Sequence, residues 1–323
     1  MQSPILLFGL PRSGTTWLGK IFDSHPDTLY WHEPDSVWRL PGSLLPAVDG
    51  VELAEQTLRA WFGRLQSGAP LKSQAKPPFF PKHYYGVGRF QLHRLMILAA
   101  SAWSRLASPP AIPFLIPTSR QDQVVPVWKS IESLGRLGLL HRRLPGLRSV
   151  HIIRHPCGYI ASVLRGESRG KFNEVSASSE DWGLFEMLVA TPQAQAVGLT
   201  MADLREMHPL QRLAWRWVIF NTKAMEELQA EAGATVCVYE KLCADPLGES
   251  QRLLVHCGLP QDKQTESFLD ASTHGQQSSY YSVFKNPLSA AERWREELDE
   301  ESIRLIMAVA GGSPPGQLYK ASS

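Results

Sequence analysis

The stretch ILLFGLPRSGTTWLGKIFDS, residues 5–24, decides the fold of this chain. Its first four residues are bulky and apolar, which is typical of a buried β-strand. A turn-forming segment with Gly9 and Gly14 follows, and from Thr15 onward apolar side chains recur at helical spacing. A strand, a glycine-bounded loop and a helix direct free backbone N–H groups and the positive end of the helix dipole at an anion. The stretch therefore predicts an anion-binding loop before the first helix.

The spacing of the two glycines matches the nucleotide-triphosphate loop, G-x-x-x-x-G-K-[ST], except at the lysine position. Thr15 stands where the lysine would contact the β- and γ-phosphates, and Thr16 stands where a hydroxyl would bind magnesium. A cation lies inside the loop instead, at Arg12. Two hydroxyls, one guanidinium and a row of amides suit a compact anion without a metal.

The string PRSGTTWL resembles the 5′-phosphosulfate loop of sulfotransferases that use 3′-phosphoadenosine 5′-phosphosulfate (PAPS). That family has a P-loop-like α/β fold, with a mostly parallel sheet flanked by helices. The resemblance implies that Trp17 lies against the adenine, although a core tryptophan would fit this position equally well. It also implies that the 5′-phosphate and sulfate are held by Arg12, Ser13, Gly14, Thr15 and Thr16. Taken alone, Arg12 would fit equally well as an ordinary surface arginine.

A second candidate region is LYWHEPDSVW, residues 29–38. His32 and Glu33 follow a predicted strand over residues 28–31, and ligands bind beyond the carboxyl ends of parallel strands. The string resembles the E-P segment of bacterial and carbohydrate sulfotransferases, which implies that Glu33 removes the proton of the acceptor hydroxyl. The alternative for Glu33 is a helix N-terminal or salt-bridging carboxylate. His32 is the second candidate base, and its alternative is a hydrogen-bonded scaffold histidine.

Lys129 ends a predicted strand over residues 124–128 and is expected at the same rim. The resemblance implies that this lysine contacts the transferred sulfuryl group, while an ordinary strand-end lysine is the alternative. In the phenol and steroid sulfotransferases a catalytic histidine follows two residues later. That position is Ile131 here, a departure that strengthens the assignment of the base to Glu33.

The string RHPCGYIASVLR begins at Arg154, after a predicted strand over residues 150–153, and places Ser162 eight residues later. An arginine and a serine at this spacing resemble the family's 3′-phosphate motif, and a phosphate favours a forked donor and a hydroxyl. Arg165 is a further candidate contact. The same resemblance implies that Tyr239 borders the adenine, while a residue of the strand core is the alternative. It also implies that Lys285 closes over the 3′-phosphate, while an ordinary surface lysine is the alternative.

Composition sets the remaining expectations. The chain has 323 residues, of which 43% are apolar, so we expect one α/β domain over residues 1–323. A net charge of +2 gives no argument for a nucleic-acid or anionic-membrane partner. Four scattered cysteines and no apolar run of 18 residues favour a cytoplasmic protein without a transmembrane segment. The oligomeric state stays open.

Residues 41–123 and 166–207 are long for connections between strands, and we interpret them as acceptor-binding insertions. The predicted function is in-line transfer of the sulfuryl group from PAPS to a hydroxyl of a small-molecule, carbohydrate or lipid acceptor, which leaves 3′-phosphoadenosine 5′-phosphate (PAP). Arg12 and Lys129 would stabilise the developing charge, and no metal is expected. A P-loop kinase or NTPase and a non-catalytic nucleotide-binding module are the alternatives.

Overall fold

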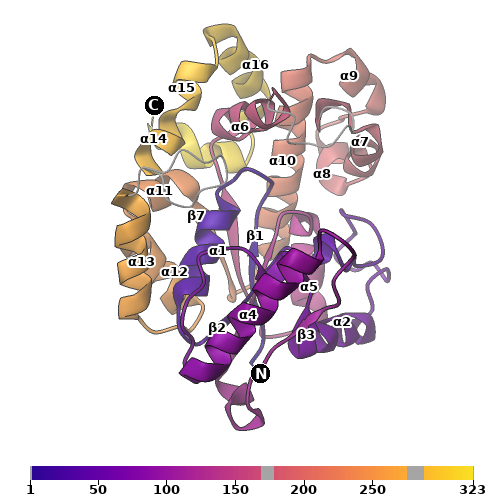
Figure 1. Ribbon diagram of the computed structural model, residues 1–323. Coiled ribbons are helices and arrows are strands. Elements are labelled where there is room, and N and C mark those ends of the chain that lie inside the picture. The colour runs from indigo at the N-terminus through magenta and orange to yellow at the C-terminus, as the bar shows by residue number, and fades with distance from the viewer. Residues whose placement is uncertain (1, 169–177, 275–286, 323) are drawn as a thin grey trace.

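The centre of the molecule is a five-stranded parallel sheet with the strand order β2-β5-β1-β6-β7 (Figure 1). The computed structural model describes residues 2–168, 178–274 and 287–322. All pairings within this sheet are parallel, as predicted. The strands are β1 (Ile5–Phe8), β2 (Thr28–His32), β5 (Val125–Ser130), β6 (Arg148–Ile153) and β7 (Ala234–Val238).

Alternate residues of β1 enter two different cores, because successive side chains of a strand point to opposite faces. Leu6 and Phe8 pack into one apolar cluster, and Ile5 and Leu7 pack into the other. Helices cover both faces, which explains why the strand is apolar at every position. On the first face lie α5 (Leu137–Arg143), α6 (Pro156–Ser168) and α10 (Pro209–Leu228); on the second lie α1 (Thr15–Ser24), α12 (Pro246–His256) and α13 (Lys263–His274).

The insertion at residues 41–123 connects β2 to β5, its neighbour in the sheet. Two very short strands within it pair antiparallel. Buried charges attach the insertion to α1: Lys20 Nζ binds Asp23 Oδ2 at 2.6 Å and donates to the carbonyl oxygens of Lys76 at 2.5 Å and Pro78 at 3.1 Å. The elements of the insertion are α2 (Glu55–Ser67), β3 (Gly68–Ala69), α3 (Leu71–Gln74), α4 (Val87–Trp103), β4 (Ile112–Pro113) and η2 (Thr118–Gln123).

The rest of the described chain is helical, and among the described residues no helix is both long enough and apolar enough to cross a membrane. The segment 166–207 contains three short helices after its undescribed part. The remaining elements are η1 (Pro34–Ser36), η3 (Leu134–Arg136), η4 (Ser178–Glu180), α7 (Trp182–Val189), α8 (Pro192–Ala196), α9 (Met201–Glu206), α11 (Tyr239–Ala244), α14 (Pro287–Glu292), α15 (Trp294–Glu297), α16 (Glu300–Ala310) and η5 (Pro315–Ser322).

Several buried histidines predict that acid destabilises the fold. Burial lowers the pKa of His93, His151 and His155 to about 4, whereas a histidine in the unfolded chain titrates near 6.5. The unfolded chain therefore binds more protons between these two pH values, so stability falls as the pH drops through that window and is retained above it. We expect the free energy of unfolding, measured with urea, to fall by about 1 kcal/mol per pH unit for each such histidine.

The variant His151→Gln keeps an amide near Asn221, whose Oδ1 lies 2.9 Å from His151 Nε2, and it should show a shallower pH slope than the wild type. His83→Gln, at an exposed histidine, serves as the control and should keep the wild-type slope. A flat wild-type profile between neutral pH and about pH 4 would contradict the prediction.

Candidate active site

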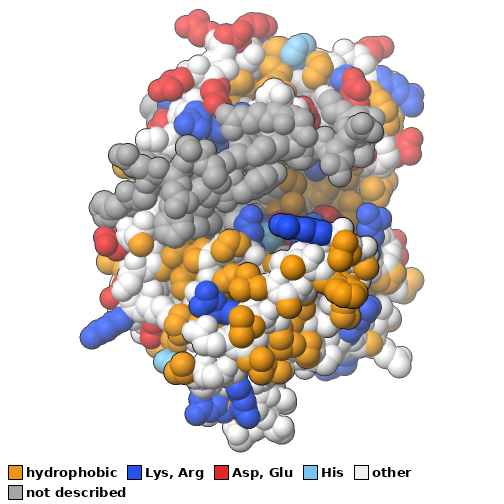
Figure 2. All heavy atoms as spheres, viewed as in Figure 1, with side chains coloured by type: hydrophobic (Ala, Val, Ile, Leu, Met, Phe, Trp, Pro, Cys, Tyr) orange, Lys and Arg blue, Asp and Glu red, His pale blue; other side chains and the backbone are white. Residues whose placement is uncertain are grey.

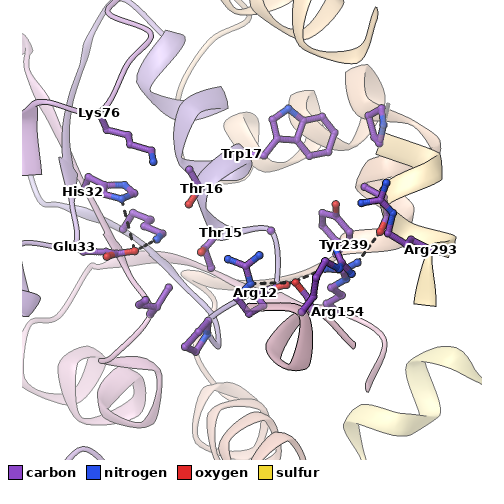
Figure 3. A pocket seen from close by; sticks show the side chains of 18 of the residues that line it. Arg12, Thr15, Thr16, Trp17, His32, Glu33, Lys76, Arg154, Tyr239 and Arg293 are labelled. Atoms are coloured by element: carbon purple, nitrogen blue, oxygen red, sulfur yellow. Dashed lines mark hydrogen bonds and ion pairs between the residues drawn. The ribbon is translucent and has the colours of Figure 1, made fainter. Parts of the chain in front are cut away.

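A cavity of about 450 Å³ lies beyond the carboxyl ends of the central strands (Figure 3). Of the candidate residues predicted from the sequence, Ser13 is buried in the loop beside the cavity, and Lys285 lies outside the described residues. The others all line the cavity: Arg12, Gly14, Thr15, Thr16, Trp17, His32, Glu33, Lys129, Arg154, Ser162 and Tyr239. The parallel strands thus bring side chains from five separate segments to one place.

The cavity has two ends with the loop between them. In Figure 3, Arg12, Thr15 and Thr16 occupy the middle, next to the start of α1. Lys76, His32 and Glu33 lie on one side of this group, and Arg154, Tyr239 and Arg293 lie on the other. The helix N-terminus therefore faces the middle of an elongated, cationic cavity.

The loop needs glycine at position 14 for two reasons. Gly14 has a φ of +90°, and a Cβ atom there would lie 2.3 Å from Cδ2 of Tyr239. The tyrosine ring therefore packs directly on the loop backbone. Tyr239 is also in contact with Arg154, whose Cζ lies 4.9 Å from the ring centroid, so Tyr239 connects the loop to the end of β6.

The two predicted anion-binding clusters meet at Arg12. Arg12 Nε donates to Ser162 Oγ at 3.1 Å, and Arg154 Nη1 donates to the carbonyl oxygen of Arg12 at 3.1 Å. Arg154 Nη2 binds the carbonyl oxygen of Ala290 at 2.6 Å. The Nε atom of Arg154 is buried without a hydrogen-bond partner among the described residues, and it lies 2.9 Å from the position that a Cβ atom on Gly158 would take.

At the opposite end, Glu33 is surrounded by cations. Lys129 Nζ donates to Glu33 Oε1, and Lys72 Nζ lies 3.9 Å from Glu33 Oε2. The backbone N–H of Glu33 donates to the carbonyl oxygen of Lys129 at 2.8 Å, which holds the two residues side by side. The salt bridge predicted as one alternative for Glu33 is therefore present. Burial lowers the pKa of Lys129, so its ammonium depends on this carboxylate.

Strain in the backbone coincides with the site. Within the described ranges, Arg12 (φ 72°) and Glu33 (φ 48°) are the two residues other than glycine with positive φ, and both line the cavity. Such conformations cost roughly 1–3 kcal/mol and persist where the surroundings hold them. At Glu33 the support comes from the hydrogen bond to the Lys129 carbonyl and from the turn that follows β2.

His32 is held as a neutral group. Its Nδ1 lies 2.9 Å from the hydroxyl of Tyr30, and its Nε2 lies 3.7 Å from Glu33 Oε1. Burial, together with the charge of Lys129, lowers the pKa of His32 well below its ordinary value. A neutral imidazole that resists protonation is a weaker proton acceptor than the adjacent carboxylate.

Sequence reasoning missed Asp35, which organises the turn behind Glu33. This buried carboxylate accepts hydrogen bonds from Ser130 Oγ, from Ser133 Oγ at 2.6 Å and from Trp128 Nε1 at 3.3 Å. Burial raises the pKa of Asp35. Its signal was the string HEPD itself, because an acidic residue next to a strand-end proline is well placed to accept hydrogen bonds from the neighbouring strand's turn.

Three cations of the cavity wall were also missed. Lys72 and Lys76 come from the 41–123 insertion, and Arg293 lies just before α15. Surface lysines and arginines carry no local signal of a site, so only the folding of the insertion identifies them. Glu33 is the one acidic side chain among the described residues that line the cavity, and Arg165 is paired with Glu297 at 2.6 Å.

Trp17 and Tyr239 are core residues that also border the cavity. Both side chains are less than a tenth exposed. Trp17 Nε1 donates to Ser272 Oγ of α13 at 3.1 Å. No group of three or more His, Cys, Asp or Glu side chains within residues 2–168, 178–274 and 287–322 could hold a metal ion.

The fold and the cavity define an α/β protein with a central parallel sheet and a cationic cavity beyond the carboxyl ends of its strands. Residues 4–263 match the model of the sulfotransferase family, and the chain therefore belongs to that family. A comparison with curated protein sequences gives no match.

Solved structures resemble the chain over its whole length. The sulfotransferase domain from the curacin biosynthetic pathway is 14% identical, with a TM-score of 0.48 over 97% of this chain and 99% of that one. The sulfotransferase domain of the Synechococcus PCC 7002 olefin synthase is 15% identical, with a TM-score of 0.46 over 97% of this chain and 98% of that one. Mouse sulfotransferase SULT7A1, whose crystal structure is a complex with PAP, is 12% identical, with a TM-score of 0.44 over 99% of this chain and 89% of that one. Membership of the family rests on the family model.

Replacement of Gly14 tests the contact between the loop and Tyr239. Gly14→Ala should destabilise the protein more than Gly146→Ala, because both positions have positive φ but a Cβ at position 146 meets no atom within 4 Å. We expect about 1 kcal/mol for Gly146→Ala from the backbone alone, and a larger loss for Gly14→Ala. Urea unfolding measures the free energy of unfolding of both variants. Equal losses would show that the Tyr239 ring moves away from position 14 with no loss of stability.

Proposed function

We propose that this sulfotransferase transfers the sulfuryl group of PAPS to a hydroxyl of an acceptor, which is a small molecule, a sugar or a lipid. The observation that carries the proposal is the hydrogen bond from Arg12 Nε to Ser162 Oγ, which joins the phosphosulfate-type loop to the 3′-phosphate-type motif in one cavity. A ligand with anionic groups at two positions fits such a donor set.

The cavity residues fit each part of PAPS. The 5′-phosphate and sulfate would be held by Arg12, Thr15, Thr16 and the amides at the start of α1. The guanidinium of Arg154 and the hydroxyl of Ser162 would hold the 3′-phosphate, while Trp17 and Tyr239 would border the adenine. When bound, PAPS supplies the activated sulfuryl group.

Glu33 then serves as the general base toward the acceptor hydroxyl. Its carboxylate lines the cavity at the end away from Arg154, next to the loop that would hold the sulfate. Lys129 Nζ donates to the Glu33 carboxylate and holds it at this end of the cavity. Lys129, beside Glu33, and Arg12 would stabilise the negative charge that develops on the transferred group.

The 41–123 insertion would contribute to acceptor binding, since Lys72 and Lys76 line the cavity at the Glu33 end. No described residue of 166–207 lines this cavity, so a role of that insertion toward the acceptor has no support from the cavity itself. The four cysteines are buried and free, which supports a reducing compartment such as the cytoplasm.

Nucleotide preference separates the candidate functions. We expect PAP to bind without metal ions and ATP with magnesium to bind far more weakly, because Thr15 replaces the lysine of the triphosphate loop. Isothermal titration calorimetry with both nucleotides tests this. A preference for ATP with magnesium would indicate a kinase or NTPase. Labelled PAPS and a panel of phenols, sugars, lipids and polyketide intermediates, analysed by mass, would then separate an enzyme from a binding module.

Glu33→Gln tests the base. We expect turnover to fall about 10²- to 10⁴-fold while the affinity for PAP, measured by calorimetry, stays near the wild-type value. Glu132→Gln, at a carboxylate on the same rim that does not line the cavity, is the matched control and should retain turnover. His32→Gln addresses the second candidate: if it abolishes turnover while Glu33→Gln does not, the base is the histidine.

A further inference from the structure

The outward face of α4 is apolar and open to solvent. Leu92, Leu95, Leu98 and Trp103 are each more than half exposed, and Leu106, just beyond the helix, is 85% exposed. We call these five residues the α4 surface. Figure 2 shows apolar side chains gathered over this part of the molecule. Six of the thirteen exposed large apolar side chains in the described chain lie between residues 87 and 106.

The opposite face of α4 is apolar as well. His93 and Ile97 are buried against the insertion, and Phe90 and Met96 are partly buried. A helix at a protein surface normally has a single apolar face, whereas α4 has large apolar side chains on its outward face as well. An exposed apolar patch of this extent marks a surface that meets another apolar phase.

The charges of the residues around α4 indicate which kind of apolar phase contacts the α4 surface. Residues 56–121 contain nine Lys and Arg residues and no Asp or Glu, although the whole chain has a net charge of only +2. The near-neutral total, which by itself gave no argument for a membrane, therefore conceals a strongly basic insertion. Arg89 and Arg105 are exposed at the borders of the α4 surface, and Arg94 lies against Phe90, with Cζ 5.7 Å from the ring.

A second copy of this chain is poorly suited to cover the α4 surface. A symmetric interface brings the same surface of each subunit together. The arginines beside α4 would then face each other, with no carboxylate anywhere in residues 56–121 to neutralise them. An anionic lipid bilayer offers what this surface lacks, since the apolar side chains can enter the acyl boundary and the arginines can meet the headgroups.

We propose that the α4 surface docks on membranes that contain anionic lipid. The helix α3 packs against both α4 and β2, and it carries Lys72, whose Nζ lies 3.9 Å from Glu33 Oε2. Docking through α4 therefore involves the same insertion that forms the Glu33 end of the cavity. The proposal concerns where the protein acts and does not depend on sulfuryl transfer.

Vesicle co-sedimentation of the purified chain tests the docking. We expect binding to vesicles of phosphatidylcholine mixed with phosphatidylglycerol, weak binding to phosphatidylcholine alone, and release by salt. Equal binding to both kinds of vesicle, or none to either, would overturn the proposal.

Leu95→Glu removes an apolar side chain from the centre of the α4 surface and should lower the partition coefficient about tenfold or more. Val255→Glu is the matched control, because Val255 on α12 is 63% exposed and Leu95 is 62% exposed. Retained affinity for PAP would show that both variants are folded. If Leu95→Glu binds vesicles like the wild type, the α4 surface is not the docking site.

Arg105→Glu tests the electrostatic part and should lower binding to anionic vesicles about fivefold or more. Arg205→Glu makes the same charge change at an exposed position on α9 and should have little effect. Light scattering after gel filtration tests the alternative that a second copy of the chain covers the α4 surface. If the wild type is a dimer that Leu95→Glu dissociates, and neither protein binds vesicles, a second copy covers the surface and the proposal fails.

Discussion

The structure depends on the contacts that hold the guanidinium groups of Arg12 and Arg154 beside the start of α1. Arg12 reaches Ser162 on α6, and Arg154 returns to the backbone of Arg12. Segments about 150 residues apart in the chain are thereby locked around one helix N-terminus. Buried Arg154 and partly buried Arg12 thus place two positive charges beside the positive end of the α1 dipole.

The two ends of the cavity satisfy their charges differently. Arg154 is in direct contact with backbone carbonyls and the Tyr239 ring, and the buried Glu240 carboxylate lies close enough to feel its charge. Around Lys129 the partner is the carboxylate of Glu33. One end of the cavity thus balances its cation with neutral groups in direct contact, and the other end balances its cation with a carboxylate.

The basic insertion connects this chemistry to the outside of the molecule. It supplies Lys72 and Lys76 to the cavity and α4 to the surface, and buried Lys20 attaches its backbone to α1. One segment thus shapes the Glu33 end of the cavity and carries the most exposed apolar side chains. Its irregular sequence is consistent with these two demands, because neither the cavity nor an outer surface imposes the periodicity of a sheet-covering helix.

The sequence alone determined the sheet, the loop and most of the cavity wall. Apolar runs such as Ile5 to Phe8, followed at once by turn residues, are typical of strands buried on both faces, and Gly14 and Arg154 were identified by local sequence patterns. What only the tertiary structure decided is which distant groups meet. Asp35 beneath the rim, Lys76 and Arg293 in the wall, and the open outer face of α4 depend on how loops and helices pack. An isolated lysine or leucine has no local preference that distinguishes a cavity from the surface, and its role is set by neighbours that folding brings from elsewhere in the chain.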